Sequence, residues 1–108
     1  MKLKNKFVAV VPVYNMEDHI IACLQSIIEQ DYQDVGIIIR DDMSTDDTAK
    51  IICDYIGCED CRVTNFKGRD ILFIKNKKKL NATGNVYESA MKYVEDDCVY
   101  GVIDGDDY

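Results

Sequence analysis

The residues best suited to chemistry in this 108-residue sequence are the aspartates near its end. Asp104 and Asp106 stand on either side of Gly105, so both carboxylates can approach one point with no side chain between them. Mg²⁺ prefers oxygen ligands and is commonly held by one or two carboxylates together with substrate phosphates. The pair therefore predicts a site for a divalent cation and a phosphate group. The alternative is a frayed acidic tail.

Two further side chains suit a nucleoside. Tyr14 offers a ring face on which a base can stack, and the Asp42 carboxylate can accept a hydrogen bond from a base N–H or a ribose hydroxyl. Stacking, an acceptor and a metal for phosphates together describe a site for a nucleoside diphosphate. Taken singly, Tyr14 could serve packing and Asp42 could be a loop carboxylate before a helix. The glycine patterns of common phosphate-binding loops are absent from the sequence.

Alternating strand and helix patterns must position these side chains. The predicted strands are 7–11, 35–40, 70–75 and 98–103, and the predicted helices run from about Asn15 to Gln30, from Ser44 or Thr45 to Ile56, and through Val86 to about Glu95. Asn15 is the expected cap of the first helix, Ser44 or Thr45 is the expected cap of the second, and 58–68 is expected to be irregular. The order β-α-β-α-β-α-β predicts a three-layer α/β/α fold with a mostly parallel, Rossmann-like sheet, in one domain spanning 1–108.

The distinctive residues follow the predicted strands. In open α/β sheets, ligands bind beyond the carboxyl ends of the strands. The candidate residues, in the order of the strands that they follow, are Pro12, Tyr14 and Asn15; Asp41 and Asp42; Lys77, Lys78 and Lys79; and Asp104 and Asp106. We expect them to meet at one edge of the sheet.

Charge and composition narrow the class of protein. A net charge of −7 argues against a nucleic-acid partner bound by phosphate neutralisation, and against an anionic membrane surface. No apolar run approaches the roughly 18 residues of a membrane span or forms a signal peptide. We expect a cytoplasmic chain, with membrane association as an alternative for the full-length protein. Cys58 and Cys61, with Cys53, could begin a zinc or redox site, but incidental thiols are the simpler interpretation.

Four ordered segments resemble the opening half of a family 2 glycosyltransferase of the A-type fold. The matching segments are Val10–Asn15, Ser26–Tyr32, Ile37–Asp46 and Val102–Asp107. The resemblance implies a nucleotide-diphospho-sugar donor, with a UDP-sugar favoured, a divalent cation (Mg²⁺ or Mn²⁺), and a saccharide or lipid-linked acceptor for the full-length protein. It also implies transfer with inversion, by an aspartate base that deprotonates the acceptor hydroxyl.

The same resemblance implies roles for individual residues. Pro12 and Tyr14 would line the base, with Asn15 beside them in the donor site. Asp42 would accept from the base, and Asp41 would support its loop. Asp104 would contact the ribose or sugar, and Asp106, with Asp104, would hold the metal that bridges the phosphates.

The sequence departs from this family in three places. Met43 stands where a glycine is usual, and Gly84 stands where an arginine near the donor is usual; we hypothesise that one of the three lysines at 77–79 replaces that cation. The sequence also ends at Tyr108, before the expected acceptor site and catalytic base, so we expect this chain alone to be inactive.

Rival classes leave different patterns in the sequence. One alternative is a non-catalytic nucleotide- or protein-binding module of the same fold. A response-regulator receiver domain is disfavoured, because Pro12 and Lys75 stand where its acidic pair and its phosphorylated aspartate should lie. A nucleotidyltransferase would usually carry a Gly-rich loop after the first strand.

Overall fold

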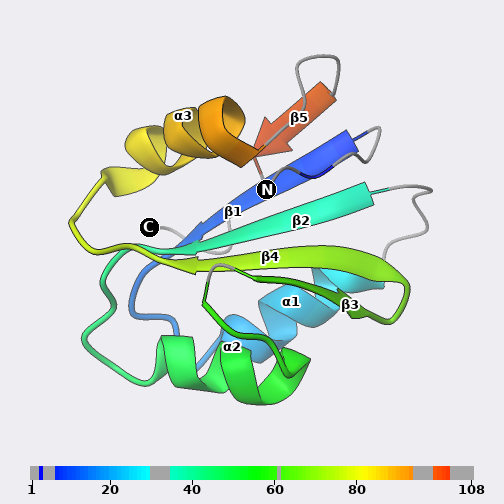
Figure 1. Ribbon diagram of the computed structural model, residues 1–108. Coiled ribbons are helices and arrows are strands. Elements are labelled where there is room, and N and C mark those ends of the chain that lie inside the picture. The colour runs from blue at the N-terminus through cyan, green and yellow to red at the C-terminus, as the bar shows by residue number, and fades with distance from the viewer. Residues whose placement is uncertain (1–2, 4–6, 30–34, 61, 94–98, 103–108) are drawn as a thin grey trace.

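The computed structural model describes residues 3, 7–29, 35–60, 62–93 and 99–102 of the chain (Figure 1). Strands and helices alternate through these residues. In chain order they are β1 (Phe7–Val13), α1 (Ile20–Ile28), β2 (Val35–Asp41), α2 (Thr48–Ile56), β3 (Arg62–Phe66), β4 (Arg69–Lys75), α3 (Asn81–Tyr93) and β5 (Val99–Val102). None of the helices in the described part of the chain is long and apolar enough to cross a membrane.

The strands form one mostly parallel sheet in the order β3-β4-β2-β1-β5. β1, β2, β4 and β5 run parallel, and only β3 is antiparallel to its neighbour β4. Val13 pairs with Asp41, and Asp41 pairs with Lys75. This register brings the carboxyl ends of β1, β2 and β4 to the same edge.

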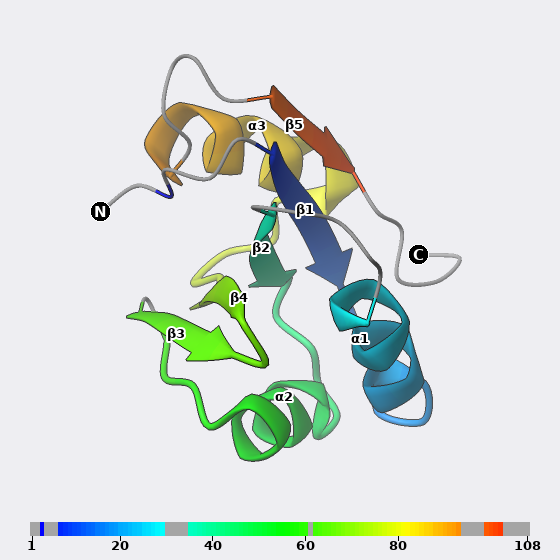
Figure 2. The same ribbon diagram turned by 90° about the vertical axis from the view of Figure 1, so that its right-hand side faces the viewer.

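Helices cover both faces of the sheet, which confirms the predicted α/β/α layering. α1 and α2 lie on one face, and α3 lies on the other, beside β1 and β5 (Figures 1 and 2). Every residue of β2 is buried, as expected for a continuous apolar run at the centre of a parallel sheet. The larger core joins Ile39 and Phe73 of the sheet to Leu24 of α1 and Ile52 of α2. Burying each such side chain contributes about 1.5–3 kcal/mol to folding.

The segment predicted to be irregular contains a strand, so this prediction was wrong. β3 pairs with β4 through a hairpin whose loop is Lys67-Gly68, with Phe66 opposite Arg69. Both loop residues have positive φ, 52° and 80°, as the tightest hairpin turns require. β3 lies at the edge of the sheet, and its side chains are exposed or half-buried. The apolar alternation that reveals a half-buried strand is therefore missing from its sequence.

The predicted helix caps were also wrong. α1 begins after His19 and α2 begins after Asp47, and neither residue makes a side-chain capping bond. Asn15 has a positive φ of 49° and lies in the loop before α1. The predicted end of the second helix at Ile56 is confirmed, and the next residue, Gly57, takes the left-handed conformation that closes a helix.

One end of β1 and one end of α3 differ slightly from the prediction. β1 continues through Pro12, because Pro12 and Val13 still pair with β2. α3 begins at Asn81, before Val86, where the apolar pattern of the predicted helix starts.

Candidate functional site

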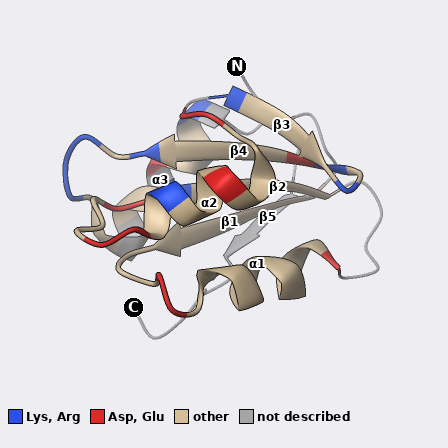
Figure 3. Cartoon of the chain, turned by 90° about the horizontal axis from the view of Figure 1, so that it is seen from below, with Lys and Arg blue, Asp and Glu red and all other residues tan. Residues whose placement is uncertain are grey.

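Three loops meet at the carboxyl edge of the sheet, as predicted. The Asp42 amide donates to the carbonyl of Val13 (3.0 Å), and the Asn76 amide donates to the carbonyl of Asp41 (2.9 Å), so backbone bonding continues one step past the strands. Figure 3 shows the acidic loop after β2 and the lysine loop after β4 at this same end. The loops after β1, β2 and β4 therefore form one surface.

Asp42 is the buried anchor of this surface. Its side chain is fully buried. Oδ1 accepts from the Leu80 amide (2.8 Å) and from Asn76 Nδ2 (3.1 Å), and Oδ2 accepts from the Asn81 amide (2.9 Å). The amides belong to the start of α3, where unpaired N–H groups favour an anion. Asp42 thus fixes the loop between β4 and α3, a role that its position in the sequence did not reveal.

One lysine joins Tyr14 to Asp42. The ammonium of Lys79 lies 3.1 Å from the centroid of the Tyr14 ring, which is half-buried. The same nitrogen is 3.7 Å from Asp42 Oδ2. The two groups predicted to recognise a base are therefore close together, and both touch this ammonium.

Asp41 supports the loop that follows it. It is 2% exposed and accepts hydrogen bonds from the amide and the hydroxyl of Ser44. Burial raises the pKa of its carboxyl group, and the bonds from Ser44 partly offset that rise. Between them, Met43 has a φ of 65°, in the left-handed region that favours glycine. A non-glycine residue therefore holds a left-handed conformation in which its side chain is strained.

Asn15 ties two of the loops together. Its Oδ1 accepts from the Thr45 amide (2.7 Å), its Nδ2 donates to Thr45 Oγ1 (3.1 Å), and its own amide donates to Ser44 Oγ (2.9 Å). The Met16 amide adds a bond to Thr48 Oγ1 (2.8 Å). These bonds hold the loop after β1 against the loop after β2. Pro12 is buried within β1 beside this loop.

A polar network beneath Asp42 was missed from the sequence. The Arg40 guanidinium is 1% exposed; it donates to Asn76 Oδ1 (2.8 and 3.1 Å), to Glu88 Oε1 (2.7 Å) and to Ser89 Oγ (3.3 Å). The bond from Arg40 lowers the pKa of Glu88. The feature of the sequence that could have revealed this network is an arginine within an otherwise apolar strand, because a buried arginine needs several hydrogen-bond partners. Asn76 thus connects Arg40 to Asp42.

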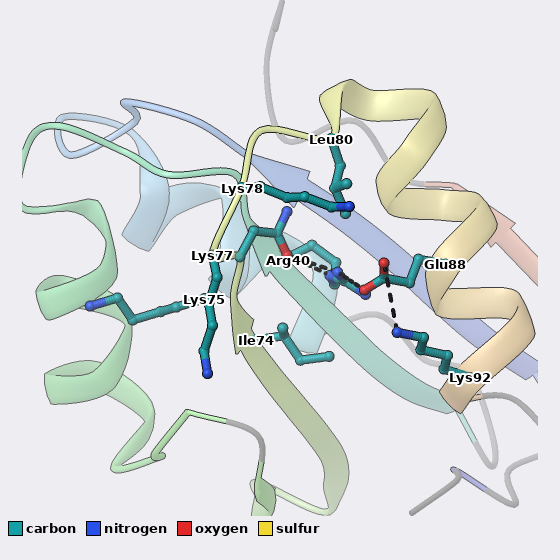
Figure 4. A pocket seen from close by; sticks show the side chains of 9 residues that line it. Arg40, Ile74, Lys75, Lys77, Lys78, Leu80, Glu88 and Lys92 are labelled. Carbon is teal, nitrogen blue, oxygen red and sulfur yellow. Dashed lines mark hydrogen bonds and ion pairs between the residues drawn. The ribbon is translucent and has the colours of Figure 1, made fainter.

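A cavity of about 410 Å³ lies on the α3 side of this network. Arg40 of β2 and Ile74 of β4 line it on the side of the sheet, and Glu88 and Lys92 line it from α3 (Figure 4). Lys75 at the end of β4 and Lys77 and Lys78 of the following loop also line the cavity. The cavity shares Asn76 and Leu80 with the surroundings of Asp42, but Tyr14 and Lys79 do not line it.

The predicted metal ligands lie outside the described residues. Asp104 and Asp106 follow β5, but the structure describes the chain only to 102. Among the described residues, no group of three or more His, Cys, Asp or Glu side chains could hold a metal ion. Metal binding therefore stays a prediction.

The cysteines do not form a reactive centre among the described residues. Cys53 and Cys58 are free thiols, and Cys61 lies outside the described residues. Burial raises the pKa of Cys58 to about 12 and also raises that of Cys53, so both thiols stay protonated. Because Cys61 is one of the residues concerned, the zinc and redox alternatives stay untested predictions.

Comparisons with known proteins identify relatives along most of the chain. A model of the family described as "Glycosyl transferase family 2" matches residues 8–108. The chain is 43% identical over 54 residues to the glycosyltransferase GlyG of Streptococcus pneumoniae. This match covers 50% of this chain and 18% of GlyG. It is 36% identical over 81 residues to the glucosyltransferase WfaP of Escherichia coli. This second match covers 60% of this chain and 32% of WfaP.

The fold has a solved counterpart. The crystal structure of residues 1–349 of TarS from S. aureus superposes with a TM-score of 0.67 and 26% identity, over 95% of this chain and 28% of TarS. The present chain thus spans less than a third of each of these three proteins.

Proposed function

Because the chain belongs to glycosyl transferase family 2, we propose that it forms the donor-binding part of an enzyme that transfers a sugar from a nucleotide-diphospho-sugar. The observation that carries this proposal is the meeting of the Tyr14 ring and the Asp42 carboxylate at the carboxyl edge of the sheet. We favour a uridine nucleotide, and TarS, which resembles this chain, has been crystallised with UDP and with UDP-GlcNAc.

Each residue of the edge has a proposed role. Tyr14 stacks on the base, and Asp42 accepts a hydrogen bond from it. Asn15 and Asp41 act indirectly, since their bonds to Thr45 and Ser44 hold the loops on which the two recognition groups stand. Asp104 contacts the ribose or the sugar.

The cation is proposed to be Mg²⁺ or Mn²⁺, held by Asp106 with Asp104. When bound, a divalent cation stabilises the negative charge of the leaving diphosphate. The chain's own contribution is to fix the base and the ribose, which presents the sugar carbon to an acceptor in one orientation.

The remaining steps need groups beyond this chain. We propose transfer with inversion to a hydroxyl of a saccharide or lipid-linked acceptor, and a carboxylate base in the rest of a longer protein would take the proton. On this proposal the isolated chain binds nucleotide weakly and transfers no sugar.

Titration calorimetry with UDP and Mn²⁺ tests the proposal. Base stacking on an aromatic ring is worth about 1–3 kcal/mol, so Tyr14→Ala should weaken UDP binding by about 5- to 150-fold. Tyr55→Ala is the matched control, because this ring packs against Phe66 (5.3 Å between centroids), away from the edge. Asp106→Ala should remove the dependence on Mn²⁺.

The opposite results are equally informative. Failure of the folded wild-type chain to bind any nucleoside diphosphate would contradict the proposal and favour the non-catalytic protein-binding module. Equal losses from Tyr14→Ala and Tyr55→Ala would show that the edge does not recognise the base.

A further inference from the structure

The Lys79 ammonium lies against both the Tyr14 ring and the Asp42 carboxylate. We propose that Lys79 occupies the position of the base in the free chain, and that the base must displace it from the Tyr14 ring in order to bind. This inference rests on the proposed function and adds a residue that sets donor affinity. Lys79 is 44% exposed, so the side chain has room to leave.

The distances from the Tyr14 ring show why a base and the Lys79 ammonium exclude each other. Atoms of a base stacked on Tyr14 would lie about 3.5–4 Å from the ring atoms, the separation of ordinary carbon contacts. The Lys79 ammonium lies 3.1 Å from the ring centroid, within that layer. A base and this ammonium therefore cannot share that face of the ring.

The contact between Lys79 and Asp42 identifies the face of the Tyr14 ring that a base would use. A base that stacks on Tyr14 and also donates to Asp42 must lie between the ring and the carboxylate. Lys79 lies there, since its nitrogen is 3.1 Å from the ring centroid and 3.7 Å from Asp42 Oδ2. One ammonium thus meets the two groups that a base would need, a ring face and an acceptor.

The neighbouring lysines do not share this position. Lys77 and Lys78 line the cavity on the α3 side, as Figure 4 shows, and Lys79 does not. Of the three lysines in the loop, Lys79 is therefore the one that can compete with a base.

The family arginine does not fit this loop without movement. A Cβ at Gly84 would lie 3.1 Å from Leu80 Cβ, closer than an ordinary contact, so a larger side chain at 84 needs Leu80 to shift.

Uridine separates competition for the ring from attraction to phosphate, because it carries no charge. We would titrate uridine into the ¹⁵N-labelled wild-type chain and into Lys79→Ala, Lys79→Arg and Lys77→Ala, and follow the amide shifts of the edge by NMR. Lys77→Ala removes the same charge from the same loop but from the cavity side. Lys79→Arg keeps a cation that can cover the ring.

Lys79→Ala should bind uridine about two- to fivefold more tightly than the wild type, the range expected for an exposed cation–π contact. Lys77→Ala and Lys79→Arg should bind like the wild type. In the free wild-type chain, the ε-methylene protons of Lys79 should be shifted upfield by the ring, and saturating UDP should remove this shift.

Three results would overturn the inference. Equal or weaker uridine binding by Lys79→Ala, in a wild-type chain that does bind UDP, refutes the competition and leaves the proposed function intact. An upfield shift that persists at saturating UDP refutes the displacement. Absence of UDP and uridine binding in every variant overturns the proposed function together with this inference.

Discussion

Replacing Arg40 by methionine removes the cation that holds the loop after β4 from below. The guanidinium is 1% exposed and bonds to Asn76, Glu88 and Ser89. Methionine fills a similar volume without making any of these bonds. Asn76 would lose the donor to its Oδ1, and Asn76 is one of the groups that bond to Asp42.

The expected loss in the free energy of unfolding follows from the groups that Arg40→Met leaves without a partner. Removing one partner of a buried ion pair costs about 3–5 kcal/mol. Glu88 is 28% exposed and can recover some hydration, which places the cost near the lower limit. We therefore expect Arg40→Met to lower the free energy of unfolding by about 3 kcal/mol, much of the 5–15 kcal/mol typical of a domain.

Urea unfolding followed by circular dichroism measures this loss. Arg62→Met is the matched control: Arg62 pairs with Glu59 at 3.4 Å, but both side chains are 72% exposed, so the change should stay within about 0.5 kcal/mol. In the Arg40→Met background, Glu88→Gln removes the stranded charge and should restore part of the loss. A loss below about 1 kcal/mol for Arg40→Met, or no coupling to Glu88, would refute the reasoning.

Three further predictions concern single residues. Met43→Gly should raise the free energy of unfolding by up to about 1 kcal/mol, because relief of the strain at φ 65° exceeds the entropy that glycine adds to the unfolded chain; a loss of stability in urea would contradict this. Glu88 has a folded pKa below its ordinary 4.5, so its contribution is complete above about pH 4.5 and is lost as the pH falls through the folded value. That acid-side slope should flatten in Arg40→Met, and an unchanged slope would contradict the assignment. Cys58, with a pKa of about 12, should react with iodoacetamide at pH 8 far more slowly than the half-exposed Cys23, as mass spectrometry of the labelled peptides would show; equal rates would disprove the burial argument.

Local patterns in the sequence predicted the sheet and the meeting of its loops at the carboxyl edge. The continuous apolar runs of β2 and β4 predict buried parallel strands, and both are confirmed. Polar residues placed after such strands must then share an edge, and the register of Val13, Asp41 and Lys75 confirms this.

Partners distant in the sequence explain what was missed. Asn15 was expected to cap its own helix, but its side chain bonds to Thr45, 30 residues away. For Asp42, only a role as acceptor for a ligand was predicted, and its bonds from amides 38 and 39 residues further on were missed. β3 carries no apolar alternation because it lies at the edge of the sheet. Such contacts depend on the completed topology and leave no local pattern.

The loops of the edge come from strands that pair in parallel, and this links the site to folding as a whole. Parallel strands cannot be joined by a short turn, so no brief segment of the chain can build the edge by itself. A molecule that binds only the assembled loops binds only the native state, and at 100 times its dissociation constant it stabilises that state by about 2.7 kcal/mol. The melting temperature of the whole chain should therefore report whether a ligand occupies the loops at the carboxyl edge. A thermal-shift screen of nucleotides can then search for the natural ligand without an activity assay.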